Sequence, residues 1–157
     1  MLDTSPVFEK IKALLDQGQV PYQLFEHEPV FTSEQAAKVR NTPQKFGAKA
    51  IVFLADKTPV LAVVPGDKRI DLKTFKKLYG IKDLRIASPE QVKELTGLEI
   101  GAIPPFGHAM NLPTYLDEQI TRNEMMAFNI GSHTKSVQMK PKDFLQLEKP
   151  IIGNFSI

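Results

Sequence analysis

Two residues of this 157-residue chain combine reactive chemistry with a suggestive setting. Lys49 is the second residue of the apolar run AKAIVFLA at residues 48–55, and His133 follows the Gly131-Ser132 pair in FNIGSHTKSV. A lysine at the end of a buried strand can hold a positive charge against a phosphate or a developing oxyanion. A histidine can transfer a proton near neutral pH or orient a hydroxyl group. Each also has an ordinary interpretation: a lysine whose ammonium group reaches solvent, and an exposed turn residue.

The other two histidines are weaker candidates. His27 lies between two glutamates, where a surface ion pair would explain it, and His108 ends an irregular loop and could line the same cavity as Lys49. The histidines lack metal-ligand spacing, and the absence of cysteine excludes disulfides, thiolate zinc sites and a cysteine nucleophile. Glycine-rich nucleotide-binding motifs, GxSxG and HExxH are also missing. We therefore expect no metal and no other cofactor.

Residues 96–113, TGLEIGAIPPFGHAMNLP, have an unusual composition, with three glycines and three prolines among apolar residues. This composition predicts an ordered, irregular loop with an apolar lining. Long irregular loops in compact domains more often serve function than not, although a structural crossover is the alternative.

Charge is unevenly distributed along the chain. Residues 38–55 hold four basic residues and no acid, and residues 66–85 hold seven basic residues against three acids. Residues 90–124 reverse the balance, with six acids against two bases. Such a distribution could present a cationic face to a polyanion, or it could reflect solvated helix faces. The net charge of +2 does not by itself argue for nucleic acid.

The pattern of apolar residues and end signals predicts a single mixed α/β (α+β) domain over residues 1–157. The runs at 48–55 and 59–66 should form a hairpin of central strands covered on both faces, because nearly every residue is apolar. Capping patterns at Thr32 and Ser88 predict the starts of two helices. Further helices are expected at 6–17, 71–80 and 141–148, and short strands at 21–28, 84–87, 114–117, 125–131 and 135–140.

The chain contains no apolar run near the roughly 18 residues of a membrane span and no visible signal peptide. With its lack of cysteine, this fits a cytoplasmic protein.

Taken together, several segments resemble the YbaK/aminoacyl-tRNA deacylase family, which includes the editing domain of bacterial prolyl-tRNA synthetases and free-standing relatives. The resemblance covers about residues 20–147, and its specificity comes from the order and spacing of the segments. The segments are VFTSEQAAKV, AKAIVFLA, LAVVPGDKRIDLKTFKK, LRIASPEQVKELTG, GAIPPFG, PTYLDE and NIGSHTKSVQMKPKDFLQL.

The resemblance implies a partly open, β-barrel-like mixed sheet flanked by helices. It also implies hydrolysis of the ester of a wrong amino acid on a tRNA, often the tRNA for proline. Neither a metal nor a protein nucleophile is needed, since an aminoacyl ester is activated and the neighbouring ribose hydroxyl can assist. The partners implied are the acceptor end of aminoacyl-tRNA and, as an open possibility, a synthetase.

The family's key lysine falls on Lys49, its Gly-x-x-x-Pro loop on Gly101 to Pro105, and its glycine turn on Gly131. Many relatives have a basic or glycine-containing pair after that glycine, whereas this chain has Ser132 and His133. We expect Lys49 and His133 to be catalytic, with His133 orienting the ribose hydroxyl or the water. The expected substrate-binding residues are Phe31, Thr32, Gly101, Ala102, Ile103, Pro105, Phe106, Gly107, Gly131 and Ser132.

Two other functions fit the same residues. One is a non-catalytic tRNA-binding or synthetase-associated module, which would need a basic face but no pocket around Lys49. The other is a domain that binds a small molecule or hydrolyses another ester, for which the basic segments would be incidental. The sequence leaves open whether an alanine, serine, threonine or cysteine ester is removed, which tRNA is preferred, and the oligomeric state.

Overall fold

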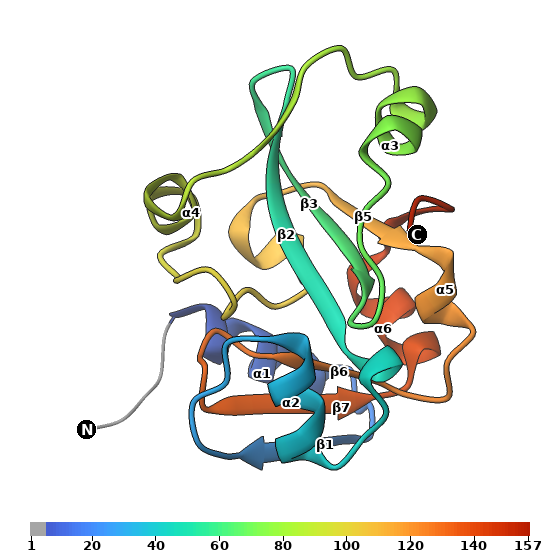
Figure 1. The fold of residues 1–157 in the computed structure, drawn as a ribbon. Coiled ribbons are helices and arrows are strands. Elements are labelled where there is room, and N and C mark those ends of the chain that lie inside the picture. The colour runs from blue at the N-terminus through green and yellow to red at the C-terminus, as the bar shows by residue number, and fades with distance from the viewer. Residues whose placement is uncertain (1–5) are drawn as a thin grey trace.

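Two almost entirely apolar strands form the centre of the fold in a computed structural model, which describes residues 6–157 (Figure 1). Strand β2 (Ala48–Ala55) pairs antiparallel with β3 (Thr58–Pro65) through a turn at Asp56 and Lys57, both with positive φ. One face of the pair contributes to a large hydrophobic cluster and the other face to a second cluster around Phe75 and Phe155. The predicted hairpin and the burial of both its faces are confirmed.

The strands form two sheets. The five-stranded sheet has the order β4-β2-β3-β5-β8; β4 (Leu84–Ile86) and β8 (Ile151–Gly153) are its edge strands, and β5 (Thr114–Asp117) lies between β3 and β8. The antiparallel three-stranded sheet has the order β1-β7-β6, formed by β1 (Tyr22–Glu26), β7 (Lys135–Met139) and β6 (Met126–Asn129).

Within residues 6–157, a single parallel backbone bridge, between Gly47 and Ala127, joins the two sheets, whose side chains also pack in one hydrophobic cluster. The sequence led us to expect a mixed, partly open, barrel-like arrangement, and the structure agrees: the strands form two sheets and no closed barrel. The physical reason is that one bridging pair cannot continue a hydrogen-bonded ladder between β2 and β6. The mixed α/β class itself is confirmed.

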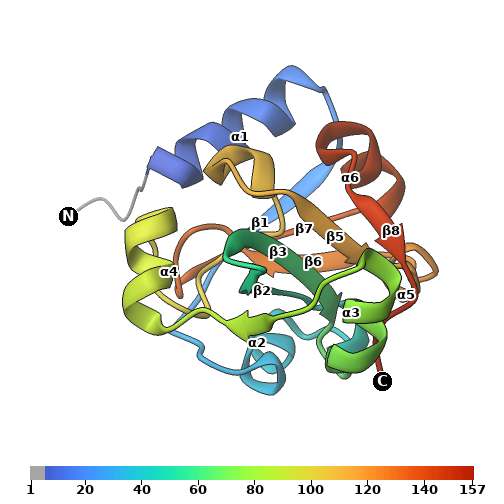
Figure 2. The ribbon, with the colours of Figure 1, turned by 90° about the horizontal axis from the view of Figure 1, so that it is seen from above.

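Helices cover both faces of the larger sheet. Figure 2 shows α1 (Pro6–Gln17) and α6 (Pro141–Glu148) on one side and α3 (Leu72–Tyr79) on the other. Helices α2 (Ser33–Arg40) and α4 (Pro89–Thr96) begin at Thr32 and Ser88, whose hydroxyl oxygens accept the predicted capping hydrogen bonds. The remaining helical segments are α5 (Glu118–Thr121) and the 3-10 turns η1 (Gln44–Phe46) and η2 (Gly107–Met110).

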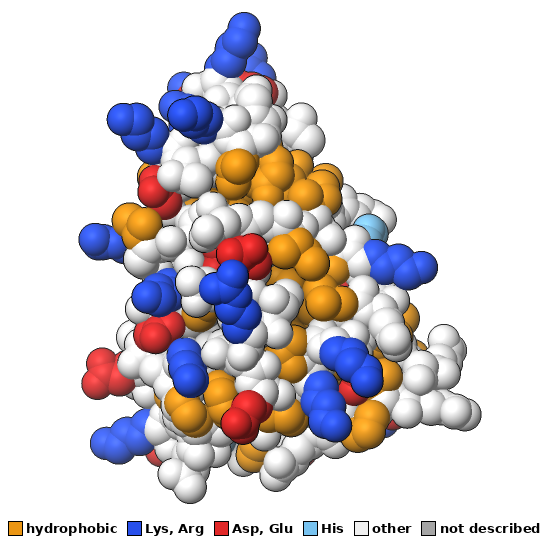
Figure 3. Space-filling model, turned by 90° about the vertical axis from the view of Figure 1, so that its right-hand side faces the viewer, with side chains coloured by type: hydrophobic (Ala, Val, Ile, Leu, Met, Phe, Trp, Pro, Cys, Tyr) orange, Lys and Arg blue, Asp and Glu red, His pale blue; other side chains and the backbone are white. Residues whose placement is uncertain are grey.

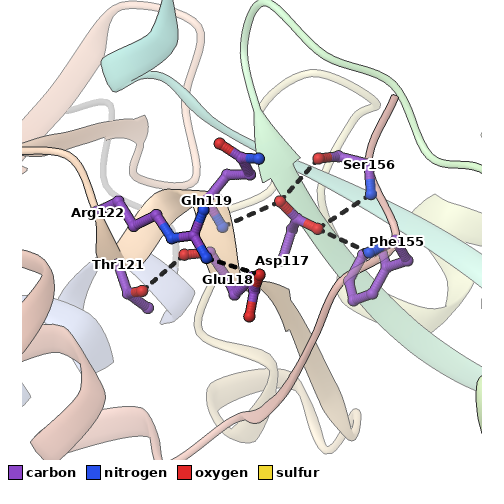
Figure 4. A network of polar contacts seen from close by, with 7 residues as sticks. All are labelled: Asp117, Glu118, Gln119, Thr121, Arg122, Phe155 and Ser156. Atoms are coloured by element: carbon purple, nitrogen blue, oxygen red, sulfur yellow. Dashed lines mark hydrogen bonds and ion pairs between the residues drawn. The ribbon is translucent and has the colours of Figure 1, made fainter.

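A buried carboxylate fastens the C-terminal segment to the larger sheet (Figure 4). Asp117, at the end of β5, is 0% exposed, and its two oxygens accept four hydrogen bonds. The donors are the backbone N–H groups of Gln119, Phe155 and Ser156 and the hydroxyl group of Ser156, at 2.8–3.1 Å. We did not predict β8 or α5, since three- and four-residue elements carry too little periodicity to be recognised.

Candidate active site

The main candidate site is a cavity of about 500 Å³ at the seam between the two sheets. Both residues of the bridging pair, Gly47 and Ala127, line it. Helix α2 lies along the cavity, and Figure 1 shows this helix beside β6 and the lower end of β2. The wall comprises residues 30–34, Ala36, Arg40, Gln44, residues 47–51, Gly66, Ile100, Gly101 and residues 127–129.

Two glycines allow the backbone segments below the cavity to approach closely. The Gly66 N–H donates to the Gly47 carbonyl oxygen at 2.7 Å, and the Gln44 amide donates to the Gly66 carbonyl oxygen at 3.1 Å. A Cβ atom on Gly66 would lie 2.6 Å from the Gln44 carbonyl oxygen, so a larger residue would push this wall apart.

Lys49 lies in this cavity, near the start of β2, as the sequence predicted for its position on the strand. Its side chain is half-buried, and Nζ donates a 2.8 Å hydrogen bond to the Lys68 carbonyl oxygen. Burial lowers the pKa of Lys49, while the charge of Asp67 opposes that shift. The ammonium group forms no ion pair with any residue in the range 6–157, so its charge is available to a ligand.

Phe31 and Thr32 line the same cavity at the start of α2. The Thr32 hydroxyl oxygen accepts from the Gln35 N–H at 3.1 Å, and the Gln35 side chain accepts from the Phe31 N–H at 2.9 Å. These two bonds fix the backbone that carries the Phe31 ring. The ring itself is 66% exposed, as a side chain that meets a ligand would be.

The GAIPP loop reaches the cavity through Gly101, which has φ +89° and is exposed. Its carbonyl oxygen accepts from the Asn129 amide at 2.7 Å, and the Ala102 carbonyl oxygen accepts from the Gly131 N–H at 2.9 Å. Ile103 lines an adjoining apolar hollow of about 120 Å³, whose wall shares Gly101 with the main cavity. The loop is therefore held against the end of β6 by its backbone.

The rest of this loop lies in the core. Pro105, Phe106 and Gly107 line none of the cavities described here, and the Phe106 ring is 0% exposed between Phe128 and Phe144. A Cβ atom on Gly107 would collide with Thr114 and with the Leu112 carbonyl group. These three expected substrate-binding residues support the loop from behind, because an apolar lining can face the core as well as a ligand.

His133 lies in a neighbouring cavity of about 460 Å³, together with Ala102, Gly131 and Ser132. Phe31 lines both cavities, and its ring centroid is 4.7 Å from that of His133. The Nδ1 atom of His133 donates to the Val30 carbonyl oxygen at 3.0 Å, and Nε2 lies 3.6 Å from Glu99. The ring therefore packs behind Phe31 and Gly101, and its catalytic role stays a prediction.

Our sequence reasoning missed Arg40 and Asn129 as site residues. Arg40, considered only as part of a basic segment, is 7% exposed and donates from Nη2 to the Asn129 side-chain oxygen at 3.2 Å. Burial lowers the pKa of Arg40 to about 10, so the guanidinium group stays protonated at neutral pH. The available signal was the helical spacing of Ser33, Ala36 and Arg40, which places them on one face of α2.

The two weaker histidine candidates lie outside this cavity. His27 Nε2 is 2.6 Å from the Ser136 hydroxyl oxygen, which in turn lies 3.1 Å from Asn129. His108 lines a separate cavity with Glu148, so the expectation that it could share the cavity of Lys49 is wrong. Within residues 6–157, no three His, Asp or Glu side chains are grouped as metal ligands. The helices of that range are too short or too polar to cross a membrane.

Comparison with known proteins gives one family and several close relatives. A family model described as "Aminoacyl-tRNA editing domain" matches residues 27–147. The chain is 34% identical over 160 residues to the "Multifunctional Ser/Thr-tRNA deacylase ProXp-y" of Escherichia coli K12, covering 99% of this chain and 96% of the relative. It is 37% identical over 101 residues to a proline–tRNA ligase of Oleidesulfovibrio alaskensis, covering 62% of this chain and 18% of the ligase.

The fold also matches a solved structure. A crystal structure described as "a putative trans-editing enzyme for prolyl tRNA synthetase" superimposes with a TM-score of 0.84 at 29% identity, over 99% of both chains. The match over nearly the full length of both chains indicates that the two proteins share one fold.

Proposed function

The chain belongs to the aminoacyl-tRNA editing domain family, and from this premise we propose that it is a trans-acting deacylase that hydrolyses the ester of a mischarged small amino acid on tRNA. The observation that carries the proposal is the cavity at the seam of the sheets, where the unpaired ammonium group of Lys49 and the exposed backbone of Gly101 line one space. A pure tRNA-binding module would have no need of this arrangement.

Lys49 supplies the charge for the reaction. Attack of water on the ester places negative charge on the carbonyl oxygen, and one well-placed donor contributes about 2.7–4 kcal/mol to such a step. Because burial weakens hydration of the Lys49 ammonium group, its attraction for a developing oxyanion is stronger than at the surface. The ester is activated and the ribose hydroxyl is close to it, so the proposed reaction uses neither a metal nor a protein nucleophile.

Gly101, Phe31 and Thr32 position the aminoacyl end. The Gly101 backbone allows close approach because no Cβ intervenes, and the exposed Phe31 ring offers a surface for the terminal base or the ribose. The hollow lined by Ile103 suits the side chain of a small amino acid, since its volume is about 120 Å³. His133 fixes the wall formed by Phe31 and Gly101, and through that wall the orientation of the ribose hydroxyl.

The proposed substrate is carried on the tRNA for proline. Its support is the similarity to a segment of a proline–tRNA ligase and to the crystal structure described above. On this reading the protein acts in the cytoplasm, on the acceptor end of the tRNA, with a synthetase as a further partner. Figure 3 shows the face that bears α3, on which Lys and Arg side chains are interspersed with acidic and hydrophobic ones.

The deciding experiment incubates the protein with tRNAs that carry alanine, serine, threonine, cysteine or proline and follows release of the amino acid, with and without EDTA. We expect release of at least one small amino acid, unaffected by EDTA, and its loss in Lys49→Ala. Binding of tRNA without any release would favour the non-catalytic module instead. Release from unrelated esters alone would favour a general esterase.

A further inference from the structure

Arg40 is a buried cation with few hydrogen-bond acceptors and no acidic partner within residues 6–157. The residue is 7% exposed, and within residues 6–157 its side chain makes one hydrogen bond, from Nη2 to the Asn129 side-chain oxygen at 3.2 Å. The Nε atom is buried without a partner, and no Asp or Glu in residues 6–157 forms an ion pair with the guanidinium group. A buried charge in this condition is costly unless a ligand compensates it.

Asn129 holds the guanidinium group in a fixed place. Its side-chain oxygen accepts from Arg40 and, at 3.1 Å, from the Ser136 hydroxyl group, while its nitrogen donates to the Gly101 carbonyl oxygen at 2.7 Å. Because each end of the amide has a defined partner, the amide cannot rotate without losing bonds. The guanidinium group of Arg40 is thereby placed at a constant position relative to Gly101, where we locate the aminoacyl ester.

The surroundings of Arg40 leave room for a ligand. Arg40 is the last residue of α2, and the residues one and two turns earlier on its cavity face are Ala36 and Ser33, which are small. Glu34 also lines the cavity but is exposed at the other end of the helix and does not pair with Arg40. An anion in the cavity would therefore meet the guanidinium group with no protein carboxylate competing for it.

We propose that Arg40 binds the phosphate group that joins the last two nucleotides of the tRNA, an inference that rests on the proposed function. An esterified amino acid carries an ammonium group and adenosine is neutral, so this phosphate is the anion nearest to the ester. A planar guanidinium group pairs well with two phosphate oxygens. In this arrangement Arg40 on α2 anchors the phosphate, while Lys49 on β2 interacts with the ester.

The kinetic test compares two small substrates that differ by one phosphate. One is 3′-O-aminoacyl adenosine, and the other is its 5′-(methyl phosphate), each with the amino acid that the tRNA panel identifies. For Arg40→Gln we expect kcat/KM to fall at least about tenfold on the phosphorylated substrate and less than about twofold on the other, since one charge-assisted phosphate contact is lost. Arg40→Lys should retain part of the preference for phosphate.

The matched control is Lys38→Gln, which removes one positive charge from an exposed position on the same helix. It should leave both substrates unchanged. An equal loss on both substrates in Arg40→Gln would overturn the proposal and assign Arg40 to the reacting ester or to the scaffold. A wild-type protein that treats the two substrates alike would overturn it as well.

A binding measurement separates this proposal from the proposed function. Titration calorimetry with adenosine 5′-monophosphate and with adenosine, with inorganic phosphate as a third ligand, requires no turnover. We expect the wild type to bind the monophosphate at least about tenfold more tightly than adenosine. Arg40→Gln, with an unchanged melting temperature, should bind the two ligands equally tightly. If no ester is hydrolysed but the monophosphate is still preferred, the proposed function is wrong and the phosphate subsite is supported. If esters are hydrolysed but the monophosphate is not preferred, the phosphate subsite is wrong. Binding of inorganic phosphate that does not depend on Arg40 would also count against the subsite.

Discussion

Arg40 and Asp117 are both buried charges, but their surroundings differ sharply. Asp117 is 0% exposed and accepts four hydrogen bonds, three of them from backbone N–H groups (Figure 4). Arg40 is 7% exposed and lines a cavity, and its side chain makes one hydrogen bond in the described part of the chain. A charge whose lone pairs are all used stabilises the fold, whereas a charge left with unused donors beside a cavity is suited to a ligand.

The different surroundings of Arg40 and Asp117 predict different effects of mutation. Removing the Asp117 carboxylate leaves several buried N–H and O–H groups without an acceptor, so the free energy of unfolding should fall. Removing Arg40 relieves an uncompensated charge, so the cost should appear in activity. The four predictions below test this division, beginning with the largest effect.

Lys49→Ala should give the largest change, because Lys49 is the other unpaired cation of the cavity. We expect deacylation to fall about 10²–10³-fold, the range for loss of one oxyanion-stabilising donor. The melting temperature should change little, since the side chain is half-buried and makes one hydrogen bond. Single-turnover rates and thermal unfolding would measure the two effects. A large loss of stability with normal activity would reverse the assignment.

Asp117→Asn should cost about 2–4 kcal/mol of unfolding free energy, because an amide nitrogen would face donors that now meet a carboxylate oxygen. The rate per folded molecule should stay within about twofold of the wild type, since Asp117 is not among the residues that line the cavity. The control is Glu118→Gln, which removes the neighbouring carboxylate and its exposed ion pair with Arg122 at a cost of about 0.5 kcal/mol or less. Urea denaturation would compare them, and equal losses would contradict the special role of Asp117.

Arg40→Met should lower activity without lowering stability, the reverse of the effect expected for Asp117→Asn. Replacing the uncompensated guanidinium group by an apolar side chain of similar length should leave the unfolding free energy unchanged or raise it by about 1 kcal/mol. Activity on tRNA should nevertheless fall. The same urea series would measure stability, and a destabilisation as large as that of Asp117→Asn would show that Arg40 belongs to the scaffold.

Glu148 should show a smaller effect that depends on pH. It is 1% exposed, and one of its oxygens accepts from Thr114 at 2.6 Å and contacts His108 at 2.9 Å; the other oxygen has no hydrogen-bond partner among residues 6–157. Burial raises the pKa of Glu148, against the lowering effect of these hydrogen bonds. The folded protein therefore holds this proton to a higher pH than the unfolded chain does. The associated stability is fully present below the unfolded pKa of about 4.3 and is lost as pH rises through the folded value.

Unfolding measurements between pH 4 and pH 8 would test this behaviour. In Glu148→Gln the decline of stability on raising the pH above about 4.3 should be reduced relative to the wild type. An unchanged pH profile in the variant would show that the decline comes from other groups. Glu148 would then resemble Asp117, a buried carboxylate whose partners offset its burial.

Much of the scaffold could be predicted from the sequence, because its signals are local. The β2–β3 hairpin follows from two apolar runs, and the starts of α2 and α4 follow from Thr32 and Ser88, whose side chains cap their own helices. Lys49 could be placed near the start of a central strand for the same reason. Elements with weak local signals, such as β8, could not be recognised.

The candidate site was predicted only in part. Lys49, Phe31, Thr32 and Gly101 do line one cavity, whereas His133 lines its neighbour. Within the GAIPPFG segment, the same apolar composition serves a cavity wall at its beginning and the core at its end, where Phe106 is fully buried. Composition cannot tell these two environments apart, because both exclude water.

The sequence by itself determined the family, the central hairpin and the position of Lys49, since each depends on residues close together in the chain. Only the tertiary structure decided which charges have partners. Arg40 and Asn129 are 89 residues apart, and Asp117 and Ser156 are 39 apart, so their hydrogen bonds exist only after the sheets and helices have packed. Whether a buried charge stabilises the fold or remains for a ligand is set by that packing, because the cost of burial depends on which donors and acceptors it brings within reach.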